Sequence, residues 1–398
     1  MKVLIAGGGI GGLATALSLH AVGVECEVFE QWTTIRELGV GINVLPHAVK
    51  ELAGLGLLDA LDRIAVRTSE LAYTNRFGQQ IWREPRGLEL GVLCEAVRAR
   101  IGDDQVHAAH QLRHFTQDDH GVTATLRLVD GSDGTVTARG DALIAADGIH
   151  STVRRTLYPG EGPPTWNGIM LWRGVVEHPP ILTGRSMVVV GGMRKARLAL
   201  YPIALQTATP DTNLLNWAVA ARLGASAGRP PRREDWNRLG RPDELVPQID
   251  GAFELSVIDP VEIVRTTREF FEFPMCDRDP VPRWSFGRVT LLGDAAHPMY
   301  PFGSNGASQA ILDARSVAPL LAGTKDVAAA LRAYEATRLP ATTGIVNDNR
   351  CGGPERVMDL VEDRAPSGFF DLERVASHAE REAIVKGYAR TAGFARIR

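Results

Sequence analysis

The sequence predicts an α/β fold in which a parallel sheet is interrupted by a mostly antiparallel sheet domain and followed by a helical C-terminal region. The apolar residues 3–6 predict a buried parallel strand, and residues 13–19 predict a helix soon after it. Residues 165–285 hold most of the tryptophans, many prolines and several strand-like stretches, which indicates an inserted sheet. The apolar strand predicted at 288–292 then returns the chain to the first domain.

A glycine-rich turn, Gly7-Gly8-Gly9-Ile10-Gly11-Gly12, joins the first strand to its helix. Here Gly7 permits the tight turn, Gly9 lets the backbone approach a pyrophosphate, and Gly12 lets helix and strand pack closely. The helix N-terminus offers N–H groups and a partial positive charge to the phosphates. Such a turn can also occur without a ligand, but strand, helix and a following acid are all in place. The sequence therefore predicts a dinucleotide site.

The acid is Glu30, which follows the second predicted strand at 25–29. Its carboxylate can accept both ribose hydroxyls of a dinucleotide and would repel a 2′-phosphate, so the site fits FAD or NAD and not NADP. Only one G-x-G-x-x-G segment is present, and we therefore expect no second dinucleotide-binding fold for a nicotinamide.

Length and composition describe an ordinary soluble protein. The chain has 398 residues, which is more than a single hydrophobic core usually holds, so two domains are expected. Its net charge is −3. No basic patch predicts nucleic-acid binding, no apolar run could span a membrane, and Met1-Lys2 leaves no room for a signal peptide. The four scattered cysteines form no C-x-x-C pair, which favours a reducing cytoplasm and disfavours structural zinc or a redox-active disulfide.

The changes in pattern divide the chain into four segments. We expect residues 1–164 to form the first part of the nucleotide-binding domain, with 66–85 contributing to the sheet of the second domain. Residues 165–285 form the substrate domain, 286–340 complete the nucleotide-binding domain, and 341–398 form the helical C-terminal region.

Two further motifs follow predicted strands. Ala146-Asp147-Gly148 ends the strand at 141–146, and Gly293-Asp294-Ala295-Ala296-His297 follows the strand at 288–292. Asp294 should therefore lie at the carboxyl edge of a strand, where ligands bind in open α/β sheets. There its carboxylate can accept a ribityl hydroxyl of a flavin.

Residues 298–306, which we call the flavin loop, are rich in turn-forming residues and lead into a helix predicted from Ala307. A helix N-terminus beside a flavin would stabilise the negative charge that builds on N1–C2=O when the flavin is reduced. Small residues let the backbone reach the ring edge. We expect the loop to act through Pro301, Gly303, Asn305 and Gly306.

The order of the three motifs resembles that of the single-component, FAD-dependent aromatic hydroxylases, the family of para-hydroxybenzoate hydroxylase, from residue 1 to about 340. Within the family, residues 39–43, 172–174 and 301–310 are most similar to the phenazine hydroxylases, and salicylate and hydroxynicotinate hydroxylases are more distant. The resemblance implies a Rossmann-like FAD-binding domain with an inserted mostly antiparallel sheet domain and a helical C-terminal region.

The resemblance also implies which residues contact the cofactor. Asp147-Gly148, with Ser151 and Arg154 after it, is similar to a segment that the family uses for both FAD and NAD(P)H. Together with the motif glycines, the expected cofactor-binding residues are Gly7, Gly9, Gly12, Glu30, Gln31, Gly41, Asn43, Leu112, Asp147, Gly148, Asp294, Gly306 and Ala307.

In this family NADH or NADPH, as a transient reductant, reduces FAD, O2 adds at C4a to give a hydroperoxide, and its distal oxygen is transferred to an electron-rich ring. The resemblance therefore implies a cytoplasmic monooxygenase, monomer or homodimer, that hydroxylates a small aromatic or N-heteroaromatic molecule. This chemistry needs shielding from water and placement of the ring more than acid–base catalysis. We expect no metal site, structural roles for His150 and His297, and a capping or surface position for His47.

An aromatic pocket is expected on the substrate domain and flavin loop, formed by Trp172, Tyr201, Met275 and Phe302. For the first three, ordinary sheet core is an equally good interpretation. Arg173 and Arg197 are candidates to pair with a substrate carboxylate, although solvated or ion-paired arginine is the safer interpretation.

One departure from the family pattern precedes a helix predicted at 92–101. The family has His-Arg-Gly-x-Leu there, and its arginine contacts FAD, whereas here Arg86-Gly87-Leu88-Glu89-Leu90-Gly91 runs directly into Val92. Either the arginine is absent, which puts FAD affinity in doubt, or residues are missing between Gly91 and Val92. The second interpretation is favoured.

Two other functions share these motifs. An isoprenoid reductase or epoxidase, such as a geranylgeranyl reductase or a zeaxanthin epoxidase, would differ only in its substrates. A non-catalytic FAD-binding protein would have a damaged flavin loop, and residues 301–306 are intact.

Overall fold

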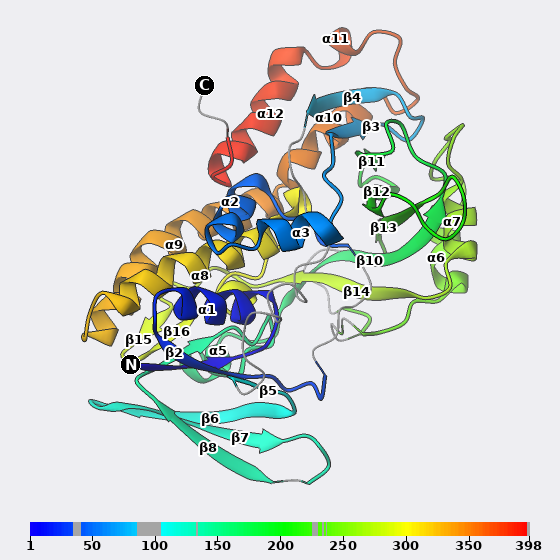
Figure 1. Ribbon diagram of the computed structural model, residues 1–398. Coiled ribbons are helices and arrows are strands. Elements are labelled where there is room, and N and C mark those ends of the chain that lie inside the picture. The colour runs from blue at the N-terminus through cyan, green and yellow to red at the C-terminus, as the bar shows by residue number, and fades with distance from the viewer. Residues whose placement is uncertain are drawn as a thin grey trace.

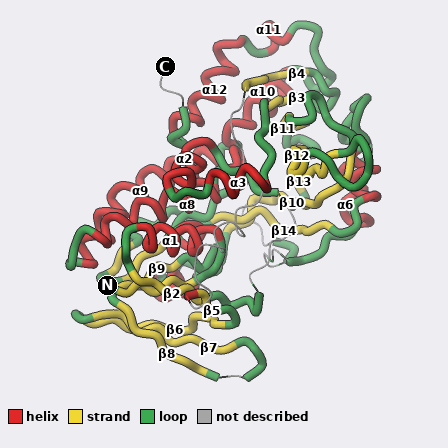
Figure 2. The backbone as a smooth tube through the Cα atoms, viewed as in Figure 1, coloured by secondary structure: helices red, strands yellow, loops and turns green. Residues whose placement is uncertain are grey.

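The computed structural model describes residues 1–395, except 35–40, 86–104, 133, 225–229, 233–234 and 236. The helix expected at 92–101 and the junction between Gly91 and Val92 therefore lie outside the described residues. Figure 1 shows the arrangement of the elements, and Figure 2 shows two groups of strands, with α1, α8 and α9 lying over the first group.

The first group contains a six-stranded sheet in the order β15-β16-β9-β1-β2-β5. Its neighbouring strands are parallel, apart from the antiparallel pair of β15 and β16. The strands are β1 (Lys2–Ala6), β2 (Glu25–Phe29), β5 (Val106–His107), β9 (Ala142–Ala145), β15 (Ser285–Phe286) and β16 (Val289–Leu291). Because both faces are covered, β1 and β9 have continuous apolar sequences without alternation.

Helices and a small sheet cover the two faces of this parallel sheet. The helices α1 (Ile10–Ala21), α8 (Gly306–Ala322) and α9 (Val327–Arg350) pack together on one side. On the other side lies an antiparallel sheet of β6 (His110–Asp118), β7 (Gly121–Leu128) and β8 (Thr135–Gly140). The short helix α5 (Thr152–Leu157) follows β9.

The second group is a seven-stranded sheet in the order β14-β10-β13-β12-β11-β3-β4, with β11 and β3 parallel and the other neighbours antiparallel. Its long strands are β10 (Thr165–His178), β12 (Ala196–Ala204), β13 (Asn213–Arg222) and β14 (Phe270–Asp277). The edge strands β3 (Glu70–Thr74) and β4 (Gln80–Pro85) come from the N-terminal part of the chain, and β11 spans Ser186–Val190. The helices α6 (Pro242–Ile249) and α7 (Pro260–Thr266) cover one face.

The helices α2 (Pro46–Gly54) and α3 (Leu58–Ile64) pack in the core of the first group. The C-terminal region contains the turn η4 (Gly353–Glu355), α10 (Arg356–Arg364), α11 (Leu372–Val375) and α12 (His378–Thr391). Apolar residues of α10 and α12 pack against β3, β4 and β11 in one buried cluster. The C-terminal region therefore closes the far edge of the second sheet.

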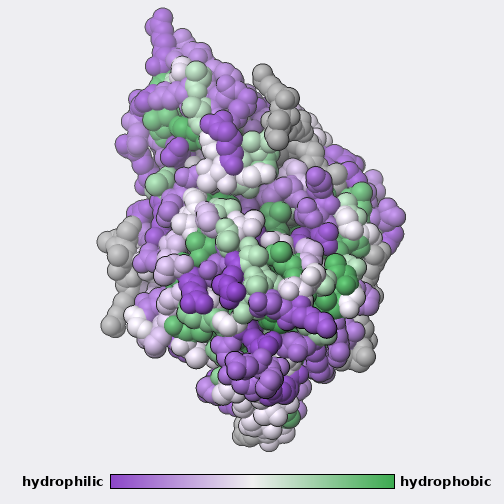
Figure 3. Space-filling model, turned by 90° about the vertical axis from the view of Figure 1, so that its left-hand side faces the viewer, coloured by the Kyte–Doolittle hydropathy of each residue, from purple (hydrophilic) through white to green (hydrophobic). Residues whose placement is uncertain are grey.

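The predicted fold class is confirmed: a parallel nucleotide-binding sheet, a mostly antiparallel second sheet and C-terminal helices. The helix after the flavin loop begins at Gly306, one residue before the predicted start. No helix in the described ranges has the length and apolarity needed to cross a membrane. On the face shown in Figure 3, hydrophobic residues are scattered among hydrophilic ones.

Candidate functional site

The glycine-rich turn brings the first two motifs into contact. Gly7 has a φ of +102°, and a Cβ there would lie 2.2 Å from the carbonyl oxygen of Ala146. A Cβ on Gly12 would lie 1.9 Å from the carbonyl oxygen of Gly7, so only glycine lets α1 start so close to β1. By contrast, a Cβ on Gly9 would meet no atom within 4 Å. The N-terminus of α1 is therefore open on the side where a phosphate would approach.

Two backbone amides hold the carboxylate of Glu30 at the end of β2. Gly8 N donates to Oε2 at 2.6 Å and Trp32 N donates to Oε1 at 2.9 Å. The side chain is 8% exposed, so it is fixed beside the glycine turn. Of the neighbouring predicted contacts, Gln31 accepts from Gln111 at the surface, whereas the side chain of Leu112 is buried in β6.

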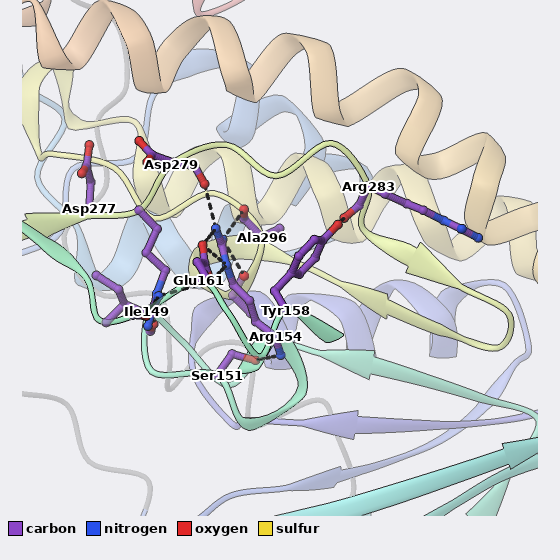
Figure 4. Close-up of polar contacts among 12 residues, drawn as sticks. Ile149, Ser151, Arg154, Tyr158, Glu161, Asp277, Asp279, Arg283 and Ala296 are labelled. Carbon is purple, nitrogen blue, oxygen red and sulfur yellow. Dashed lines mark hydrogen bonds and ion pairs between the residues drawn. The ribbon is translucent and has the colours of Figure 1, made fainter. Parts of the chain in front are cut away.

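Arg154 joins the second motif to the third (Figure 4). Its guanidinium donates to the carbonyl oxygens of Ala295 at 3.1 Å and Ala296 at 2.8 Å, and to that of Asp279 at 2.8 Å. It also forms an ion pair with Glu161, and the side chain is only 1% exposed. Arg154 thus fixes the backbone immediately after Asp294. Because its side chain is buried, it cannot contact a nicotinamide bound at the surface.

The other residues of the second motif form the start of α5. Ser151 caps this helix by accepting from Arg154 N at 2.9 Å, and Asp147 accepts from Thr152 N at 2.7 Å. Burial raises the pKa of the Asp147 carboxyl. Gly148 has a φ of +76°, and a Cβ there would meet no atom within 4 Å. The backbone at Gly148 is therefore also open to a ligand.

A buried ion network lies behind Asp294. Asp313 of α8 accepts from His297 Nε2 at 2.6 Å, from Arg338 Nε at 2.7 Å and from Gly293 N at 3.1 Å. His297 is 4% exposed and its ring lies 5.4 Å from that of Trp284. These contacts give His297 a structural role. The side chain of Asp294 itself is exposed, and desolvation by the surrounding protein raises the pKa of its carboxyl.

His47 differs from expectation. It is half-buried in α2, its ring stacks on Phe394 with centroids 5.6 Å apart, and its Nε2 lies 3.3 Å from Nε2 of Gln309. Burial, with a contribution from Arg338, lowers its pKa to about 4. His47 is therefore a neutral packing residue, neither a helix cap nor a surface residue.

The C-terminal region holds the flavin loop. Gly303, with a φ of +66°, donates its N–H to both oxygens of Glu355, at 3.0 and 3.1 Å. The hydroxyl of Tyr388 donates to the carbonyl of Phe302 at 3.0 Å and accepts from Asn305 Nδ2 at 2.8 Å. A Cβ on Gly303 would lie 2.3 Å from the Tyr388 ring. The hydrogen bonds of Glu355 and Tyr388 to the flavin loop were not predicted from the sequence, because neither residue lies in a recognisable motif.

The predicted loop residues have different surroundings. Pro301 is exposed, Asn305 is fully buried, and a Cβ on Gly306 would meet no atom within 4 Å. Beside Ala307, the next residue Ser308 accepts from Leu45 N at 3.0 Å. Asn43 Nδ2 lies 3.4 Å from the Ser304 hydroxyl. The 41–45 segment and the flavin loop are thus bound to each other, and the N-terminus of α8 is left open.

Only part of the predicted aromatic pocket comes together. Met275 and Phe302 pack in one buried cluster with residues of β10 and β13. Tyr201 donates to the carbonyl of Gly41 at 2.8 Å. Trp172 instead lies on the opposite face of the sheet, 1% exposed, with its Nε1 3.2 Å from Glu272. Since successive strand residues alternate between faces, Trp172 belongs to the core under α6 and α7 and is removed from the pocket.

Comparison with known proteins gives consistent matches. The model of a family described as FAD binding domain matches residues 1–349. A phenazine 1,6-dicarboxylic acid hydroxylase of Lysobacter antibioticus is 40% identical over 87% of this chain and 89% of its own. A 3-amino-4-hydroxybenzoate 2-monooxygenase of Streptomyces platensis is 32% identical over 89% of this chain and 88% of its own. The solved structure of Klebsiella pneumoniae HpxO complexed with FAD and uric acid is 25% identical, with a TM-score of 0.76 over 99% of this chain and 97% of that one.

Proposed function

This chain belongs to the FAD binding domain family as an FAD-dependent monooxygenase, and we propose that it hydroxylates a small aromatic or N-heteroaromatic substrate with NADH or NADPH and O2. The relatives that it matches are named for a phenazine dicarboxylic acid and an aminohydroxybenzoate, which supports a ring substrate. We further propose that it works in the cytoplasm as a monomer or homodimer.

The residues present fit FAD. The main support for the proposal comes from Gly9, Gly148 and Gly306, one in or beside each of the three motifs. A Cβ at any of these glycines would meet no protein atom within 4 Å, so a ligand could approach the backbone there. In our proposal Glu30 holds the adenosine ribose, the N-terminus of α1 binds the pyrophosphate and Asp294 binds the ribityl chain. When bound, FAD would supply the redox chemistry, accepting a hydride from NAD(P)H and activating O2.

The protein's own contribution is electrostatic and steric. The first N–H groups of α8 and the positive end of its dipole would stabilise negative charge on a flavin bound beside this helix. The apolar side chains around Phe302 and Met275 would exclude water from the chemistry that the bound cofactor supplies. Glu355 accepts from Gly303 N, and Tyr388 accepts from Asn305 and donates to the Phe302 carbonyl, so that the geometry of the loop is set before the substrate binds.

Glu30→Ala is expected to weaken FAD binding by roughly 1–3 kcal/mol, the range for a hydrogen bond to a charged group. The variant loses the ribose acceptor and also the partner of the Gly8 amide. Fluorescence titration of the apoprotein with FAD measures the change. Glu27→Ala in β2 is the control, because Glu27 forms an ion pair with Lys2 and, among the described residues, has no hydrogen bond or ion pair with the glycine-rich turn. Equal affinities for the two variants would contradict the assignment of Glu30.

NAD(P)H oxidation is expected to be slow alone and to accelerate when the right aromatic compound is present. Without an aromatic substrate, reduction of the flavin would consume NAD(P)H and O2 without forming a hydroxylated product. We therefore expect NAD(P)H to reduce the flavin rapidly only when a substrate is bound. A screen of aromatic acids and N-heterocycles, followed by mass spectrometry of products formed under isotopically labelled O2, makes the test. Equal oxidation rates with and without every compound would instead favour a reductase or oxidase, including one acting on isoprenoids.

A further inference from the structure

The N-terminus of α8, where we place the flavin, has no side-chain cap. The N–H groups of Gly306, Ala307 and Ser308, the first residues of the helix, donate to no other described residue. The residue before a helix often accepts from such groups through its side chain, and asparagine is among the best residues for this role. Here that residue is Asn305. The helix start is therefore open although a good capping residue is in place.

Both ends of the Asn305 side chain are bound to other side chains. Its Oδ1 accepts from Nε2 of Gln309 at 3.2 Å, and its Nδ2 donates to the hydroxyl of Tyr388 at 2.8 Å. Asn305 is fully buried, and Gln309 and Tyr388 are 2% and 3% exposed, so water does not compete for these groups. The oxygen that would cap the helix is therefore already in use.

The backbone before the helix is also held in a conformation that does not cap. Asn305 has a φ of −92° and a ψ of −24°, which are helical values, whereas a capping residue has an extended backbone. The preceding residue, Ser304, has a φ of +54°, which is uncommon for a residue with a side chain and costs free energy. Such a conformation persists only when its surroundings hold it. Release of the Asn305 side chain would let this segment relax toward a cap.

A cation fixes the orientation of the Gln309 amide. Arg338 Nη2 donates to Gln309 Oε1 at 2.6 Å, and Arg338 Nε donates to the buried Asp313 at 2.7 Å. Since an arginine side chain offers only donors, the oxygen of Gln309 must face it and the NH2 group must face Asn305. Gln309 thus connects the buried ion network to the start of α8.

We infer that Gln309 is a positioning residue: by binding Asn305 it keeps α8 uncapped and leaves the first N–H groups of the helix free for the reduced flavin. This inference rests on the proposed hydroxylase function, in which the flavin lies beside this helix. A cap would satisfy these N–H groups and would offset the positive end of the helix dipole with a side-chain oxygen. In the uncapped protein, the flavin would supply the missing acceptor.

The first test needs no flavin. Hydrogen–deuterium exchange of the peptide that covers residues 303–309 is followed by mass spectrometry in the full-length protein freed of FAD. Gln309→Met keeps the length of the side chain and removes its amide, so Asn305 is expected to cap the helix and to slow exchange there about fivefold. His47→Phe is the matched control. It keeps a ring to stack on Phe394 and removes only the contact, at 3.3 Å, between His47 Nε2 and the same Gln309 amide, so exchange should match the parent.

The second test measures the midpoint potential of the bound flavin by photoreduction against a reference dye. In Gln309→Met the reduced flavin is expected to bind about tenfold more weakly relative to the oxidised flavin, which for two electrons lowers the potential by about 30 mV. Asn305→Ala removes the side chain that could cap, so Gln309→Met should have no further effect in that background. Tyr388→Phe releases the other end of Asn305 and should lower the potential too, which tests the inference if Gln309→Met does not fold.

The outcomes separate the two claims. The inference is wrong if Gln309→Met changes neither exchange nor potential, or if it lowers the potential equally with and without the Asn305 side chain. It is also wrong if His47→Phe has the same effects, or if exchange slows while the potential stays unchanged. If FAD binds and no aromatic compound is hydroxylated, the proposed function fails, and the exchange and the potential still decide whether Gln309 keeps α8 open for the flavin.

Discussion

A Gly306→Val variant is expected to fold normally and to lose most of its hydroxylation activity. A Cβ at this position meets no protein atom within 4 Å, so the fold has room for the side chain. That room is where we place the pyrimidine edge of the flavin, and a β-branched side chain would push the ring away from the N-terminus of α8. Loss of a preorganised donor to a developing negative charge costs about a hundredfold or more in rate.

The same displacement should lower the reduction potential of the bound flavin, because its reduced, anionic form loses a stabilising dipole. Photoreduction against a reference dye measures the potential, and product formed per NAD(P)H consumed measures coupling. Gly160→Val is the control, since Gly160 also faces open space but lies far along the chain, in the turn after α5. If potential and product yield in Gly306→Val both match the parent, the placement of the active site at this helix is wrong.

Asp313→Ala is expected to lower the free energy of unfolding by about 3–5 kcal/mol, the usual effect of removing one partner from a buried ion pair. Asp313 is fully buried, and its loss leaves Arg338 and His297 without their shared acceptor. Urea unfolding of the purified protein measures the change. Asp326→Ala, which removes only the exposed cap of α9, should cost about 0.5–2 kcal/mol. Similar costs for both variants would mean that the network is no stronger than a surface cap.

The network also sets the direction of a pH dependence. Burial alone would raise the pKa of Asp313, but His297 and Arg338 outweigh it and hold that pKa below the ordinary value of 3.8. Since the folded-state pKa is lower than the unfolded-state value, the stabilisation is fully present above that value and is lost as the pH falls toward the folded-state pKa. The gap between parent and Asp313→Ala should therefore narrow only in acid.

Those parts of the fold and site that depend on neighbours in sequence were predictable. The turn after β1 needs Gly7 and Gly12 because the backbone itself would clash with any Cβ. Glu30 is the residue that directly follows β2, so its position at the end of that strand could be read from the sequence. The same logic located Asp294 at the end of β16. In each case the signal is a short motif at a strand end.

Parts that depend on distant pairing were not predictable. Trp172 and Arg173 are adjacent in β10, and only the register against β13 and β14 decides which of them faces the flavin loop. Tyr388 reaches its partner Asn305 across 83 positions of sequence, and nothing in its own segment marks it. His47 is likewise half-buried through its contact with Phe394, which is 347 positions further along the chain.

The anchoring of residues 302–305 by Glu355 and Tyr388 has a thermodynamic consequence for the whole molecule. These hydrogen bonds form within the protein and do not require the cofactor. The loop therefore loses its conformational entropy when the protein folds, and this loss does not weaken FAD binding. Both anchors lie beyond residue 349, where the match to the family model ends. The C-terminal region therefore supports the loop at which we place the flavin, and a substitution at Glu355 or Tyr388 is expected to change the geometry of that loop.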